Sequence, residues 1–212
     1  MRARLGLLLA RQEIMVRAIK LTNKPAEMLA VSAKGTVPVL VVPCEIGETG
    51  NKTLEVIDES LEVMLWGLRK NDPQNLLYRG DPKALPDMLD LIKRYDNEFV
   101  NVLEKYKHAS RYHDFSQLFY RRECERFIIE LESALDKHDF LIGPRASLVD
   151  YALLPFIRQF ARVDRKWYLQ TPYPNVRQWL NTQLQQPLFT KAMAKFPLWT
   201  DNQEEFILGK SV

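Results

Sequence analysis

The sequence predicts an α+β protein whose N-terminal part mixes helices with strands and whose C-terminal part is all helical. Helix and strand patterns alternate up to about residue 68, and a stretch rich in turn-forming residues follows at 71–86. Strand patterns stop after that stretch. The 212 residues suffice for two domains, which we expect at 1–70 and 87–212, with 71–86 as the linker.

The N-terminal part begins with a helix, because apolar residues recur at helical spacing at Leu5, Leu8 and Leu9. A short helix is expected from Pro25 to about 31, since proline suits the first turn of a helix. A longer helix follows a cap at 58 or 59. Glycines and an asparagine in 44–52 indicate a hairpin loop. The expected strands are 12–19, 39–42 and 53–57.

Long amphipathic patterns fill the C-terminal part. Apolar residues at helical spacing predict helices at 87–107, 115–135, 147–163 and 176–184. The third of these begins with Ser147 and Asp150, in which the serine oxygen can cap the helix and the aspartate can reach back to the serine N–H. We interpret this pair as a structural cap.

The most informative motif is a proline at the start of a buried strand, preceded by Gly35-Thr36-Val37. Proline lacks an N–H and fixes its own φ, so it fits a strand only at its start. The bond before a proline is also the one that adopts cis at modest cost. A cis Val37–Pro38 bond would turn the Val37 N–H and C=O outward, where they could pair with another peptide. The pair Glu59-Ser60 opens the following helix, whose free N–H groups favour an anion.

These motifs resemble the glutathione transferase family, and the resemblance covers nearly the whole chain. It implies an N-terminal thioredoxin-like, glutathione-binding domain followed by the family's all-α C-terminal domain. By the same resemblance, the backbone of Val37 would bind the cysteinyl backbone of glutathione, and Glu59 with Ser60 would hold its γ-glutamyl end. Lys24 would meet the glycyl carboxylate, for which a flexible ammonium is suitable. Glutathione would serve as cosubstrate.

The resemblance is incomplete at the catalytic position. The family normally begins with a strand and a loop bearing a Ser, Tyr or Cys that acts on sulfur, and this chain begins at Met1–Arg4 instead. We therefore expect a truncated first domain with unpaired strand edges. The catalytic residue is unknown, because neither Cys44 nor Cys124 stands at the position of the family's catalytic residue. Either the start was assigned at an internal methionine or the chain is a natural truncation. The sequence does not decide between them.

Composition narrows the partners and the location. The net charge is +3 with basic residues spread along the chain, which argues against dedicated nucleic-acid binding. No apolar run approaches the length of a membrane span, so no membrane partner is expected. The two cysteines are isolated and stand in no metal-ligand spacing. This usage suits a reducing compartment, and we expect a cytoplasmic protein without a metal.

Two functions remain open. The first is a glutathione-dependent transferase or thiol reductase acting on a small hydrophobic or thiol-reactive electrophile. The second is a non-catalytic, glutathione transferase-like binding or regulatory protein, which the missing catalytic residue favours for the chain as given. The resemblance also implies a homodimer, with Met64, Leu65 and the face of 87–99 as candidate contacts. The second substrate would lie against aromatic side chains: Tyr106, Tyr112, Phe156 and Trp167.

Overall fold

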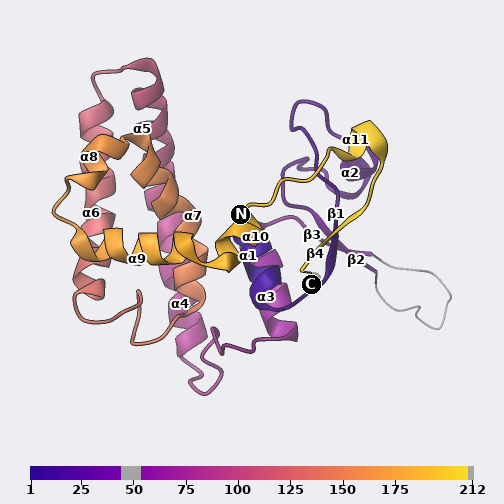
Figure 1. Cartoon of the computed structure of the whole chain (residues 1–212), viewed down its shortest axis with the longest axis horizontal. Coiled ribbons are helices and arrows are strands. Elements are labelled where there is room, and N and C mark those ends of the chain that lie inside the picture. Colours follow the sequence, from indigo (N-terminus) through magenta and orange to yellow (C-terminus); the bar gives the residue numbers. More distant parts are fainter. Residues whose placement is uncertain (44–53, 210–212) are drawn as a thin grey trace. The chain divides into compact units, whose positions relative to one another are not determined.

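The computed structural model describes residues 1–43 and 54–209, which form two compact units (Figure 1). Unit 1 comprises Met1–Pro73 together with Thr190–Val212, and unit 2 comprises Gln74–Phe189. The segment from Thr190 onward therefore groups with the first unit, whereas the sequence analysis placed it in the helical domain. The expected hairpin loop at 44–52, with Cys44, falls on residues 44–53, outside the described part.

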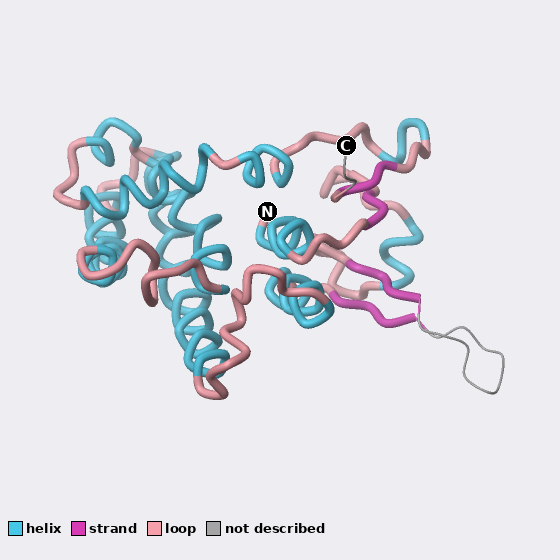
Figure 2. Tube along the Cα trace, turned by 60° about the horizontal axis from the view of Figure 1, so that its bottom comes forward, coloured by secondary structure: helices cyan, strands magenta, loops and turns pink. Residues whose placement is uncertain are grey.

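Unit 1 mixes helices with short strands, as the sequence predicted. The strands form two antiparallel pairs, β1 with β4 and β2 with β3 (Figure 2). Ile14 lies opposite Leu208 in the first pair, and Leu40 lies opposite Ile57 in the second. The elements in chain order are α1 (Arg2–Leu9), β1 (Ile14–Val16), α2 (Ala26–Val31), β2 (Leu40–Pro43), β3 (Leu54–Ile57), α3 (Ser60–Lys70), α11 (Trp199–Asn202) and β4 (Phe206–Leu208).

Strand β4 is the strand that the sequence analysis missed. It pairs with β1 along all three of its residues, and each strand in the described residues pairs with only one other strand, which fits the expectation of unpaired strand edges. Arg4 donates to the carbonyl oxygen of Ala194 at 2.7 Å, and the Trp199 N–H donates to Ala18 O at 2.8 Å. These contacts fasten the C-terminal segment to the N-terminal elements of unit 1.

Helix α1 packs directly on α3. A side chain at Gly6 would come within 2.5 Å of the Met64 Cα, so only glycine allows this close approach. Met64 and Leu65 are fully buried. The expectation that they form a subunit contact is therefore wrong, because this face of α3 is used inside the chain. A second group of buried residues connects the helices to the strands: Ala3, Leu7, Leu40, Val63 and Leu208.

All the elements assigned within unit 2 are helices, which confirms the predicted all-helical class. The pattern at 87–107 corresponds to one continuous stretch that includes a π-helical turn. The elements are α4 (Ala84–Arg94), the turn η1 (Tyr95–Phe99), α5 (Val100–Tyr112), α6 (Gln117–Leu135), α7 (Leu148–Val163), α8 (Arg165–Leu169) and α9 (Pro174–Gln185), followed by α10 (Pro187–Ala192) at the boundary.

An aromatic core holds unit 2 together. The rings of Tyr106 and Trp167 both pack around Phe160, with centroid distances of 6.0 and 5.8 Å. Tyr106 is fully buried there, whereas Tyr112 is exposed at the end of α5. The aromatic residues expected to line a substrate site are thus not gathered on one surface, because helical periodicity does not distinguish core aromatics from binding aromatics.

The predicted cap of α7 is present, and it is extended by two further donors. The Asp150 carboxylate accepts from the Ser147 N–H at 2.9 Å and from the Ser147 hydroxyl at 2.7 Å. It also accepts from the Leu141 N–H at 3.0 Å and from the Trp179 indole N–H at 3.1 Å. Burial raises the pKa of Asp150, and these donors oppose that effect.

Candidate functional site

The loop 32–38 joins α2 to β2 and carries the predicted motif. The Val37–Pro38 bond is cis, as the sequence predicted. Gly35 has φ +56°, a conformation that glycine adopts without strain. Val37 is 51% exposed, and its N–H and C=O have no hydrogen-bond partner within residues 1–43 and 54–209. This backbone is therefore available to pair with an extended peptide.

Lys24 lies against the same loop. A side chain built at Gly35 would come within 3.4 Å of the Lys24 Nζ. The ammonium group thus lies beside the backbone two residues before Val37, where it can attract a carboxylate of a molecule bound there.

Lys34 connects this loop to the start of α3. Its Nζ donates to Glu59 Oε1 at 2.7 Å and to Asp58 Oδ1 at 3.2 Å, and these hydrogen bonds raise the pKa of Lys34. The Ser32 hydroxyl donates to Asp58 Oδ2 at 3.2 Å. The sequence analysis named position 58 only as a possible helix cap and did not assign Ser32, Lys34 or Asp58 to the site, because these residues meet only after folding.

Ser60 is the first residue of α3, and Glu59 is its N-cap residue. The Ser60 hydroxyl accepts a hydrogen bond from the Arg2 Nε at 3.0 Å. Arg2 is buried, so its guanidinium holds a fixed positive charge beside the helix N-terminus. The charge of Arg2 and the helix dipole together favour an anion at this end of α3.

The contacts place three of the four predicted residues along the loop 32–38. Val37 belongs to the loop, Lys24 lies beside Gly35, and Glu59 is joined to Lys34; Ser60 follows Glu59 directly. The resulting surface offers cationic groups, a carboxylate, free backbone groups and a helix N-terminus. Such a set suits a small zwitterionic peptide.

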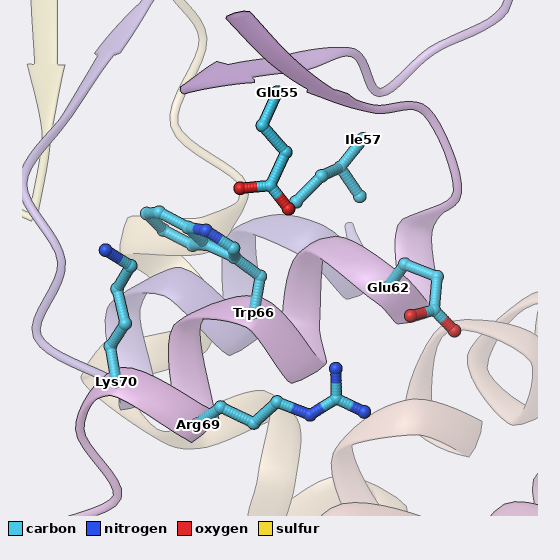
Figure 3. A pocket seen from close by; sticks show the side chains of 6 residues that line it. All are labelled: Glu55, Ile57, Glu62, Trp66, Arg69 and Lys70. Carbon is cyan, nitrogen blue, oxygen red and sulfur yellow. The ribbon is translucent and has the colours of Figure 1, made fainter. Parts of the chain in front are cut away.

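A separate hollow of about 390 Å³ lies between β3 and the outward face of α3 (Figure 3). The Lys70 ammonium lies 4.7 Å from the centre of the Trp66 ring in this hollow. None of the predicted site residues lines it. The lining residues are Glu55, Ile57, Glu62, Trp66, Arg69 and Lys70.

Cys124 is unsuited to act as a nucleophile, and this leads to a test. It is fully buried in unit 2, and burial raises the pKa of its thiol to about 12. The thiolate is the reactive form, so the folded protein should resist iodoacetamide at Cys124 near neutral pH. Mass spectrometry of the Cys124 peptide should show modification in urea and almost none without it. Equal modification rates in both states would contradict the assigned burial.

The comparisons with known proteins identify the family. Residues 1–75 match the family model described as glutathione S-transferase, N-terminal domain, and residues 98–182 match glutathione S-transferase, C-terminal domain. The chain belongs to the glutathione transferase family. The expected architecture, a thioredoxin-like domain followed by an all-α domain, is confirmed. No curated protein sequence matches the chain.

Solved glutathione transferases share the fold at low sequence identity. A family member from Pseudomonas fluorescens pf-5, with two glutathione bound, has a TM-score of 0.74 at 15% identity, covering 90% of this chain and 86% of that chain. Glutathione S-transferase I from mais, in complex with an atrazine glutathione conjugate, has a TM-score of 0.69 at 21% identity, covering 90% of this chain and 89% of that chain. Glutathione transferase Omega 3C from Trametes versicolor has a TM-score of 0.69 at 14% identity, covering 93% of this chain and 85% of that chain.

Proposed function

We propose that this glutathione transferase family member binds glutathione at the loop 32–38 and the N-terminus of α3. It would then act as a glutathione-dependent transferase or thiol reductase on a small electrophile. The main support is that Val37 is exposed and that its N–H and C=O have no hydrogen-bond partner among the described residues, in a loop that Lys34 joins to Glu59. We further propose a cytoplasmic location and a homodimer, as the family resemblance implies.

Each part of glutathione has a proposed partner of suitable chemistry. The cysteinyl backbone pairs with the N–H and C=O of Val37. The γ-glutamyl carboxylate lies at the Ser60 end of α3, where helix N–H groups and Arg2 favour negative charge. The α-ammonium lies at Glu59, and the glycyl carboxylate lies at Lys24. Glutathione bound to the Pseudomonas fluorescens protein supports this ligand class.

The contact between Lys34 and Glu59 is compatible with binding. Both side chains are largely exposed, and exposed ion pairs are weak and screened by salt. The ammonium of glutathione can therefore share or replace the Lys34 contact at the Glu59 carboxylate. Lys34 also donates to Asp58, so it stays bonded to the residue before the N-cap of α3 when Glu59 turns to the ligand.

A non-catalytic binding or regulatory role is the second candidate. The observations that favour it concern the thiol and hydroxyl groups in the described part of the chain that could activate or attack sulfur. The Cys124 thiol is buried in unit 2, and the Ser32 and Ser60 hydroxyls beside the candidate site are engaged by Asp58 and Arg2. Binding of glutathione without turnover would match this role.

Glu59→Ala is expected to weaken glutathione binding by about 10- to 100-fold. A hydrogen bond to a charged group contributes about 1.5–3 kcal/mol, which corresponds to that range. Isothermal titration calorimetry measures the change. Glu62→Ala is the matched control, because it removes the same charge three residues further on, in the first turn of α3, where Glu62 lines the separate hollow. Equal affinities for the two variants would rule out the proposed role of Glu59.

Turnover distinguishes the two candidate functions. Conjugation of a model electrophile and glutathione-dependent reduction of a mixed disulfide are measured on the same protein. Turnover in either assay that falls with Glu59→Ala supports the enzyme. Measurable glutathione binding with no turnover in both assays supports the regulatory role.

A further inference from the structure

The tip of the α5–α6 hairpin exposes apolar side chains that the proposed function does not use. Phe115 is fully exposed in the loop 113–116, and Phe119 is 59% exposed in the first turn of α6. Tyr112 and Leu118 are also exposed beside them. Figure 1 shows this loop at the end of the two long helices α5 and α6. We call Tyr112, Phe115, Leu118 and Phe119 the apolar tip.

The loop of the hairpin is held in a defined conformation. His113 has φ +54°, and the Asp114 N–H donates to Ala109 O at 2.9 Å. Asp114 Oδ1 accepts from both the N–H and the hydroxyl of Ser116, each at 2.7 Å. These bonds fix the backbone on both sides of Phe115. Its exposure is therefore a property of an ordered turn.

Positive charge is concentrated around the apolar tip. Residues 111–122, which include the apolar tip, contain three Arg and one acidic residue, a net charge of +2. Arg111 and Arg122 are exposed and form no ion pair within the described residues.

We propose that the apolar tip docks on an anionic membrane surface. Exposed aromatic side chains flanked by Lys and Arg are the chemistry that inserts into the headgroup region of such a bilayer. Each Lys or Arg near an anionic surface strengthens binding about fivefold. The end of a helical hairpin suits a deformable lipid surface, since a protein partner would need a matching hollow. A second copy is disfavoured, because a two-fold contact would place the same net charge of +2 against itself.

The experiment is co-sedimentation of the full chain with phosphatidylcholine vesicles and with mixed phosphatidylcholine/phosphatidylserine vesicles. We expect binding to the mixed vesicles that weakens with added salt, and much weaker binding to phosphatidylcholine alone. Phe115→Ala/Phe119→Ala should reduce binding roughly tenfold or more. Arg111→Gln/Arg122→Gln should reduce it by about 25-fold.

Matched controls separate the tip from general effects. Ile129→Ala removes an exposed apolar side chain further along α6, and Lys137→Gln removes an exposed charge beyond its end. Both should bind as the unaltered protein does, and circular dichroism should confirm that every variant is folded. The proposal is overturned by absence of binding to the mixed vesicles, or by binding that the tip variants do not change. Competition by polyglutamate equal to that of lipid would instead assign the tip to an acidic polypeptide. A change of oligomeric mass in the double phenylalanine variant would assign it to a second copy.

Discussion

Replacing Asp150 by alanine is expected to lower the free energy of unfolding by about 3–5 kcal/mol. The substitution removes one acceptor from four donors: the N–H and hydroxyl of Ser147, the Leu141 N–H and the Trp179 indole N–H. Each buried donor left without a partner costs about 1–3 kcal/mol. The alanine variant no longer buries a carboxylate, and this gain offsets part of the summed cost of the unpaired donors. Urea titration followed by tryptophan fluorescence measures the loss.

Asp139→Ala is the matched control, because Asp139 is exposed and lies shortly before α7. Its effect should stay within about 0.5 kcal/mol, as for most surface substitutions. Asp150→Asn should fall between the two, since the amide keeps one accepting oxygen. A loss below about 1 kcal/mol for Asp150→Ala would mean that the donors find other partners, and the network would then not hold the start of α7.

The features that could be predicted from the sequence are those with local signals. Helices α6 and α7 repeat apolar residues over many turns, so their periodicity is clear. The Ser147 and Asp150 cap is a contact between residues three apart. The cis Val37–Pro38 bond could be expected because the bond before a proline adopts cis at modest cost, and because proline fixes its own φ and lacks an N–H. In each case, the residues that decide the structure are neighbours in the chain.

The features that were missed depend on contacts between distant residues. Lys34 meets Glu59 across 25 positions, and Arg2 meets Ser60 across 58. Charged side chains at such separations have many possible partners, and only the fold selects one. Strand β4 is the clearest example, since three apolar residues are too short for a periodic pattern. Its partner β1 lies almost at the other end of the chain.

Leu208→Ala is expected to lower the free energy of unfolding by about 2–5 kcal/mol, the range for a leucine removed from a core. Leu208 is 4% exposed and packs in the same cluster as Leu40, which begins β2 two residues after Pro38. The cavity would therefore lie behind the loop that carries Val37. We expect weaker glutathione binding as well, because that loop would lose part of its support. Urea titration and calorimetry measure the two effects.

Ile207→Ala tests whether these effects come from the buried face of β4. Ile207 is the preceding residue of the same strand and is 48% exposed, because side chains alternate between the two faces of a strand. Its replacement should change stability by much less than that of Leu208, and should leave glutathione affinity unchanged. Equal losses in the two variants would show that β4 acts only through its backbone pairing with β1. No loss in either would mean that the C-terminal segment contributes nothing to unit 1. A loss confined to Leu208→Ala would make a residue at the far end of the chain part of the support of the glutathione-binding loop.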